Sequence, residues 1–269
     1  MTKREYAEAI AELVNGEVNE VEKANGVVMT AILPKGEMKM KPNMYIDTLY
    51  NDETPIEEAA ETVKQAFEAN SDQDFDPSEI TDFTKARKYL RVRLYNKKTS
   101  AEVFISAARY GFDDLIIIPY LEFTMNGSMA AVKVTEQLLN AWDKTKEQVM
   151  RIARRNSLML SGYEVKTMVE VMREIMGDMP PFMEQETPPM YVVTNANKSF
   201  GAYGVIALNI TLKNMFPEGY AVLPSSIHEV IVIPKNTEKY DELKSMINEV
   251  NDTVVEDVDV LGYKPYFFG

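Results

Sequence analysis

The side chains best suited to chemistry lie in residues 222–234, whose sequence is VLPSSIHEVIVIP. Ser225 and Ser226 form a pair of hydroxyls, and His228 is the only histidine of the chain. A serine nucleophile needs a base within hydrogen-bonding distance and a third group that orients this base. In an extended strand, Ser226 and His228 would share one face, with Cα atoms roughly 7 Å apart at about 3.3 Å per residue. These three residues are therefore the candidates for a hydrolase site.

A structural role is the favoured interpretation of the same residues. Pro224 and the two serines have the composition of a turn, in which hydroxyls bond nearby backbone groups. Neither serine lies in the Gly-x-Ser-x-Gly elbow of the α/β-hydrolases. His228 precedes an apolar run, and the chain has no cysteine and no second histidine to join it. We therefore expect His228 to be structural, with binding and catalytic roles as the alternatives.

A basic segment, residues 85–98, is the second candidate site. Its basic residues are Lys85, Arg87, Lys88, Arg91, Arg93, Lys97 and Lys98. Apolar and polar residues alternate within it, which is typical of a half-buried strand. The polar face of this strand holds Tyr89, Arg91, Arg93 and Tyr95. Arginines flanked by aromatic rings bind the phosphates and bases of single-stranded nucleic acids. The favoured alternative is that the segment pairs with acidic residues 51–80 of the same chain.

The net charge of −13 is unevenly distributed along the chain. Residues 1–80 carry eighteen acidic and seven basic residues, a net charge of −11, whereas residues 81–160 have a net charge of +6. Acidic side chains are dense on and just before the predicted helix over residues 54–70, namely Asp52, Glu53, Glu57, Glu58, Glu61 and Glu68. Such a face would bind a basic partner, whereas the overall negative charge disfavours general affinity for nucleic acid.

The composition argues against metal and cofactor sites. A chain with one histidine and no cysteine lacks the usual zinc ligand sets. Residues 72–76 resemble the start of an EF-hand loop, but Pro77 and Phe83 stand where glycine and glutamate are required. The glycines within residues 201–204 are too few for a dinucleotide or phosphate-binding loop. We therefore expect no metal and no cofactor.

The elements that must position these residues come in mixed order. Hydrophobic periodicity predicts helices over residues 2–15, 54–70, 135–142, 144–156, 163–176 and 237–250. It predicts strands over residues 17–33 (a hairpin), 88–95, 114–123, 129–134, 191–194, 220–223, 229–233 and 263–268. Residues 202–208 fit either a strand or the start of a helix. This order indicates an α+β fold with mostly antiparallel sheets flanked by helices.

Residues 177–189 are the candidate domain boundary, because they contain four prolines and no helical periodicity. We therefore expect two α+β lobes, residues 1–180 and residues 190–269, which could also pack as one unit. No apolar run approaches the roughly 18 residues that span a bilayer, so no membrane partner is expected. Residues 1–13 lack the apolar core of a signal peptide, and we expect the protein in the cytoplasm.

The segment VLPSSIHEVIVIP resembles a bacterial family, domain of unknown function 5688. The sequences MYVVTN (residues 190–195) and MINEVNDTVV (residues 246–255) strengthen the resemblance. The sequences NGV (residues 25–27) and PNMYIDTLY (residues 42–50) extend it over nearly the whole chain. The family supplies no catalytic residues to carry over. The resemblance implies a soluble bacterial protein of a kind that mobile genetic elements carry.

Three classes of function remain. A non-enzymatic protein-binding or regulatory factor is favoured, because no catalytic set is complete and the charge is strongly polarised. In one variant, the acidic surface mimics nucleic acid and occupies a basic host protein, which would suit the cargo of a mobile element. The alternatives are a hydrolase that uses Ser225 or Ser226 with His228, and a nucleic-acid binder that uses Arg91 and Arg93. The sequence determines neither the partner nor the oligomeric state.

Overall fold

The computed structural model describes residues 1–23, 26–36, 41–47, 49–50, 54–71, 75–98, 101–125, 128–177, 189–235 and 239–269. Helices are interspersed with three sheets, and all strand pairs among these residues are antiparallel. The predicted α+β class is therefore confirmed. None of the helices in this part of the chain combines the length and the apolar character needed to cross a membrane.

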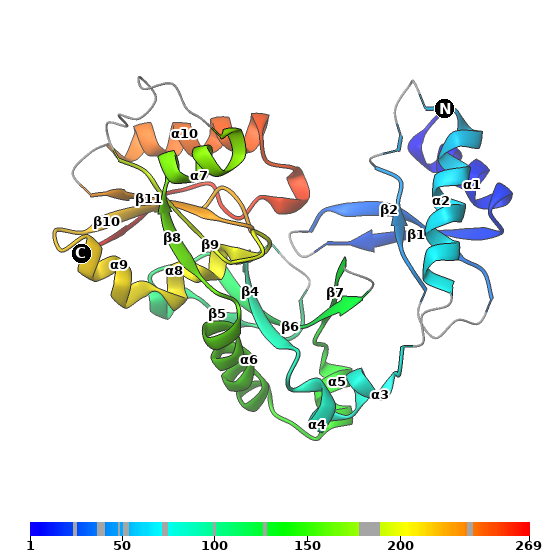
Figure 1. The fold of residues 1–269 in the computed structure, drawn as a ribbon, viewed down its shortest axis with the longest axis horizontal. Coiled ribbons are helices and arrows are strands. Elements are labelled where there is room, and N and C mark those ends of the chain that lie inside the picture. Colours follow the sequence, from blue (N-terminus) through cyan, green and yellow to red (C-terminus); the bar gives the residue numbers. More distant parts are fainter. Residues whose placement is uncertain are drawn as a thin grey trace.

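The N-terminal lobe, residues 1–71, consists of two helices packed on one sheet (Figure 1). The helices are α1 (Lys3–Leu13) and α2 (Ile56–Ser71). The sheet has the order β1 (Gly16–Glu22), β2 (Val28–Pro34) and β3 (Met44–Tyr45). A capping box begins α1, in which Thr2 Oγ1 accepts from the backbone N–H of Glu5 and the Glu5 carboxylate accepts from that of Thr2. The predicted first helix and hairpin are thus present.

The rest of the chain, residues 75–269, forms the body of the molecule, which lies to the left of the lobe in Figure 1. Its first sheet contains β4 (Leu90–Asn96), β5 (Ile105–Ser106), β6 (Leu115–Met125) and β7 (Ser128–Lys133). Strand β6 pairs with each of the other three. The helices of this part are α3 (Ser78–Thr81), α4 (Phe83–Ala86), η1 (Ala108–Tyr110), α5 (Glu136–Trp142) and α6 (Lys146–Leu160).

The second sheet of the body has the order β12-β10-β11-β9-β8. Its strands are β8 (Glu164–Thr167), β9 (Tyr191–Thr194), β10 (Tyr220–Leu223), β11 (Val230–Pro234) and β12 (Tyr266–Phe268). Around it are α7 (Met168–Met176), η3 (Gly201–Tyr203), α8 (Gly204–Ala207), α9 (Asn209–Met215), α10 (Tyr240–Thr253) and η4 (Asp257–Asp259). The predicted helix over residues 163–176 is wrong at its start, because residues 164–167 pair with β9 as a strand.

The buried side chains form clusters that divide the chain near residue 71. One cluster runs from Tyr6 to Phe67 within the N-terminal lobe. The largest cluster runs from Ala86 to Tyr266 and joins both sheets of the body. Strand β8, which precedes residues 178–188, already belongs to the second sheet. The predicted division into residues 1–180 and 190–269 stays a prediction, and the segment between them lies largely outside the described residues.

Candidate functional site

The ring of His228 is held by two groups from distant parts of the chain. Its Nδ1 accepts a hydrogen bond from the backbone N–H of Phe200 at 3.1 Å. Its Nε2 lies 3.1 Å from Oδ2 of Asp259. A ring nitrogen that accepts carries no proton, so Nε2 is the protonated nitrogen and donates to the carboxylate. Both nitrogens are therefore engaged by partners other than Ser225 and Ser226.

The two serines are buried, and the hydrogen bonds around them involve backbone groups. Ser226 Oγ accepts from the backbone N–H of His228 at 3.0 Å, which is the local bond of a serine turn. The carbonyl of Ser225 accepts from the N–H of Leu261 at 3.1 Å. In addition, the N–H of Ile227 donates to the carbonyl of Asp259 at 2.8 Å. This segment is a junction that ties residues 259–261 to the second sheet.

A tight loop brings Phe200 against His228. The side chain of Asn195 closes the loop, since its Oδ1 accepts from the N–H of Ser199 at 3.1 Å and its Nδ2 donates to the carbonyl of Ser199 at 2.9 Å. Phe200 has a φ of 55°, in the left-handed region. At Gly201, a Cβ atom would lie 2.6 Å from the backbone nitrogen of Asn195 and 2.7 Å from the carbonyl oxygen of His228. Only glycine fits this approach.

Arg93 is buried rather than presented to solvent, with 5% of its surface exposed. Its Nε donates to Glu122 at 2.8 Å. Its guanidinium carbon lies 3.4 Å from the ring centroid of Phe200 and 4.5 Å from that of Tyr120. The interpretation of this strand as half-buried is therefore wrong. The loop that carries Phe200 covers the face that the alternation marks as polar.

The other residues of the predicted nucleic-acid face are also engaged. The guanidinium of Arg91 donates to the carbonyls of Lys88 and Leu90, and burial lowers the pKa of Arg91. Tyr89 packs on Phe123 with 4.4 Å between ring centroids, and Tyr95 is buried. Two lysines of the basic segment form ion pairs with acidic residues in the range 51–80, as the alternative interpretation predicts. These are Lys85 with Asp76 and Lys88 with Glu79. Arg91 and Arg93 thus belong to the internal packing of the body, whereas Arg87, Lys88, Lys97 and Lys98 of the segment are exposed.

A hollow of about 370 Å³ separates the N-terminal lobe from the body beside Arg93. Lys23, Met29 and Tyr45 line it from the lobe. The body contributes Arg93, Tyr95, Tyr120, Ala131, Phe200, Ile227, Val258 and Asp259. Arg93 and Asp259, the carboxylate partner of His228, therefore line the same hollow.

The predicted acidic face lies on the outer side of α2. Glu57, Glu58 and Glu61 are exposed, while Ala59 and Val63 of the same helix are buried. No residue that the structure describes forms an ion pair with these three glutamates. Glu68 of the predicted face is also exposed, whereas Asp52 and Glu53 lie outside the described residues.

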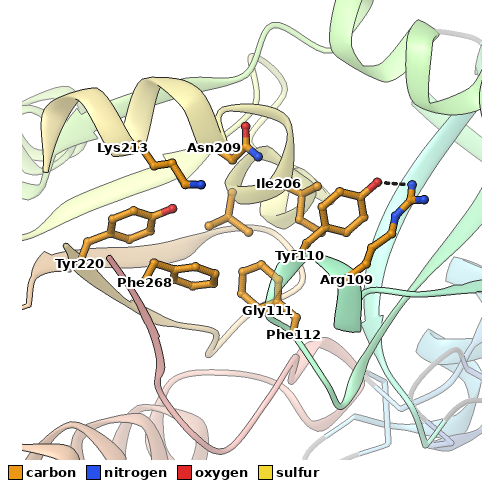
Figure 2. Close-up of a pocket in the computed structure, with 10 residues that line it drawn as sticks. Arg109, Tyr110, Gly111, Phe112, Ile206, Asn209, Lys213, Tyr220 and Phe268 are labelled. Atoms are coloured by element: carbon orange, nitrogen blue, oxygen red, sulfur yellow. Dashed lines mark hydrogen bonds between the residues drawn. The ribbon is translucent and has the colours of Figure 1, made fainter. Parts of the chain in front are cut away.

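The body also has a basic groove that no sequence pattern predicted, and this groove consists of two adjoining hollows. The first has a volume of about 270 Å³ and is walled by aromatic rings, with Lys213 and Arg109 at its rim (Figure 2). The second, of about 620 Å³, lies between α6 and the segment η3–α9. The two hollows share Arg109, Tyr110, Ile206 and Asn209. The second adds Ile105, Glu147, Met150, Arg151, Arg154, Arg155, Leu158, Tyr203 and Ala207.

The comparisons with known proteins bear on the whole chain. The model of a family of unknown function, DUF5688, matches residues 2–269. The chain belongs to this family. No curated protein and no solved structure matches it. The predicted family is thus confirmed, and the geometry of this DUF5688 member is the basis for inferring what it does.

The basic groove of this DUF5688 member has only a weak signature in its sequence. The arginines of α6 lie in the run RIARR, within the third of the chain that has a net positive charge. Residues 151, 154 and 155 are spaced to share one face of a helix. Their role as one wall of a groove depends on the placement of α6 across the hollow from η3, α8 and α9. That arrangement brings together segments about fifty residues apart, which periodicity alone does not reveal.

Proposed function

We propose that this protein is a non-enzymatic protein-binding or regulatory factor of the cytoplasm, whose N-terminal lobe docks on a basic partner protein. The observation that carries the proposal is the outer face of α2. Glu57, Glu58 and Glu61 on this face are exposed, and none of them has an ionic partner among the described residues. They belong to a lobe with its own hydrophobic cluster, so the charge sits on a separately packed unit.

A partner with basic side chains would meet Glu57, Glu58 and Glu61 on one stretch of helix. Exposed charges attract over about one Debye length, roughly 8 Å at physiological salt. Such complementarity increases the association rate and selects against acidic partners. In the variant that suits the cargo of a mobile element, this face mimics nucleic acid and occupies a basic host protein.

The two alternative functions gain less support from the geometry. A hydrolase would need His228 to bond a serine hydroxyl, whereas its ring nitrogens contact Phe200 and Asp259. A nucleic-acid site on the strand of Arg91 and Arg93 would need exposed guanidinium groups. Arg93 instead lies between two aromatic rings and pairs with Glu122.

The proposal is tested by affinity capture from a bacterial lysate with a triple variant, Glu57→Gln, Glu58→Gln and Glu61→Gln. Glutamine is chosen because lysine in the first turn of α2 would oppose the helix dipole. The control is a second triple variant with the same change in charge, Glu229→Gln, Glu249→Gln and Asp252→Asn, at exposed positions of the body. We expect a partner with an excess of lysine and arginine that the wild type and the control retain and the α2 variant loses.

A partner retained equally by all three proteins would contradict docking through α2. A fluorophosphonate probe of serine nucleophiles tests the non-enzymatic part of the proposal separately. We expect no adduct on Ser225 or Ser226 by intact mass and peptide mapping. A stoichiometric adduct on either serine, lost in His228→Gln, would establish a hydrolase instead.

A further inference from the structure

The wall of the basic groove formed by α6 presents a row of cations. Arg151, Arg154 and Arg155 lie at positions i, i+3 and i+4, which spreads them over about 6 Å along the helix at about 1.5 Å per residue. Arg154 is held in place, because its Nε donates to the hydroxyl of Tyr203 at 3.2 Å. Arg151 and Arg155 are exposed, and no ion pair joins either of them to a residue within the described ranges. Glu147 is the one acidic residue among those that line the groove.

The first hollow of the groove places the partly exposed rings of Tyr110 and Phe268 beside polar groups, whereas the rings of Phe112 and Tyr220 are buried in its wall. The rings of Tyr220 and Phe268 stack with 5.1 Å between centroids, and Phe112 lies 5.2 Å from Phe268. Lys213 and Asn209 project from α9 above this row of rings (Figure 2). No hydrogen bond from another described side chain occupies the Lys213 ammonium or the Asn209 amide. Both groups are therefore positioned to bind a ligand.

Close packing of the backbone keeps these rings at the floor of the hollow. Gly111 follows η1 with a φ of 92°, and a Cβ atom there would lie 2.6 Å from the Phe268 ring. Tyr110, the preceding residue, contacts the guanidinium groups of Arg109 and Arg154 at 4.7 and 5.2 Å from its ring centroid. The aromatic floor and the row of cations are thus joined through Tyr110 into one continuous surface.

We propose that the basic groove binds single-stranded nucleic acid, with phosphates along Arg151, Arg155 and Lys213 and a base in the hollow against the partly exposed rings of Tyr110 and Phe268. Proteins that bind single strands combine a cationic track for the backbone with aromatic rings on which bases stack. This groove has both features, and Asn209 adds an amide that donates and accepts hydrogen bonds at a base edge. Bases of a duplex are stacked and paired, so a single strand suits the hollow better.

The net charge of −13 does not oppose this assignment locally. The acidic N-terminal lobe lies to the right in Figure 1, whereas α6, α8 and α9 lie in the opposite half of the molecule. Local clusters of one sign dominate the field within about a Debye length, so the groove attracts phosphate at physiological salt. The site is separate from the proposed docking face of α2.

The test is fluorescence anisotropy of labelled oligothymidylate and oligouridylate with the full-length protein at several salt concentrations. The double variant Arg151→Gln and Arg155→Gln should bind about tenfold more weakly at physiological salt. The slope of log K against log salt should become shallower by roughly 1.4, because each phosphate contact on a single strand contributes about 0.7. The control is Lys64→Gln with Lys244→Gln, two exposed lysines outside the groove, which gives the same net charge. It should bind like the wild type.

Three results would overturn the assignment. The first is absence of oligonucleotide binding by the wild type even at low salt. The second is inorganic polyphosphate that competes as well as oligothymidylate of equal charge, which would remove any role for a base in the hollow. The third is a difference in oligomeric state, measured by light scattering, in which the wild type is a dimer and the double variant is a monomer. The groove would then bind the acidic lobe of a second copy. Circular dichroism of each variant establishes that it is folded.

Discussion

A substitution of Arg93 tests whether its buried guanidinium stabilises the body of the molecule. Arg93→Met removes the guanidinium and keeps a long, unbranched side chain in the same space. The arginine is 5% exposed, donates to Glu122 at 2.8 Å and lies 3.4 Å from the ring centroid of Phe200. The substitution therefore removes a buried ion pair and a cation–π contact together.

The magnitude follows from burial. Removing one partner of a buried ion pair costs about 3–5 kcal/mol, because the remaining charge is left uncompensated. The side chain of Glu122 is 23% exposed and keeps some water, which favours the lower end of that range. A desolvated cation–π contact contributes about 2 kcal/mol, part of which the packing of methionine replaces. We expect Arg93→Met to lower the free energy of unfolding by about 3–4 kcal/mol, whereas an exposed ion pair would give about 0–1 kcal/mol.

Urea unfolding followed by tryptophan fluorescence measures this change. Trp142 is the only tryptophan, it is 5% exposed, and it belongs to the same buried cluster as Tyr120. The signal therefore reports the body rather than the N-terminal lobe. Arg87→Met is the matched control, because Arg87 is an exposed arginine of the same basic segment. It should stay within about 0.5 kcal/mol of the wild type.

An Arg93→Met protein as stable as the Arg87→Met control would show that the buried guanidinium does not stabilise the body. A double-mutant cycle with Glu122→Gln separates the ion pair from the aromatic contacts. If the pair carries the effect, the double variant should lose much less stability than the sum of the single variants.

Two further predictions concern the scaffold of the body. His228→Gln should lower the free energy of unfolding by about 1–3 kcal/mol, because the N–H of Phe200 loses its acceptor; an unchanged urea midpoint would contradict the structural role. Hydrogen bonds from Lys166 and Lys198 lower the pKa of Glu174 from 4.5 to about 2. Because the folded-state pKa lies below the unfolded value, this stabilisation is present above about pH 4.5 and is lost as pH falls through about 2. The difference in melting temperature between wild type and Glu174→Gln should therefore shrink over that range, and a constant difference would argue against these ion pairs.

Local sequence patterns predicted many helices and strands, because the spacing of apolar residues within each of these elements indicates its type. The hydrophobic spacing of α1 and the alternation of β4 each identified an element from neighbouring residues. Strand β8 was missed because its identity depends on pairing with β9, across a segment that contains four prolines. Helical spacing alone did not distinguish these four residues from the helix α7 that follows them.

Sites that depend on distant contacts were less accessible to prediction. The alternation of apolar and polar residues placed Arg93 on the polar face of its strand. It did not reveal that the loop containing Phe200 covers that face. The sequence likewise suggested a structural His228 without naming Asp259 as its partner. The basic groove requires α6 to lie across the hollow from η3 and α9, and no local pattern records that arrangement.

Docking of the acidic face of α2 on a basic protein predicts a complex whose affinity depends strongly on salt. Binding of the captured partner to the wild type and to the triple glutamine variant should be measured by biolayer interferometry over a series of salt concentrations. We expect the wild-type affinity to fall steeply with salt, and the variant to bind weakly with little dependence on salt. An affinity that does not change with salt, or that the variant retains, would contradict the account.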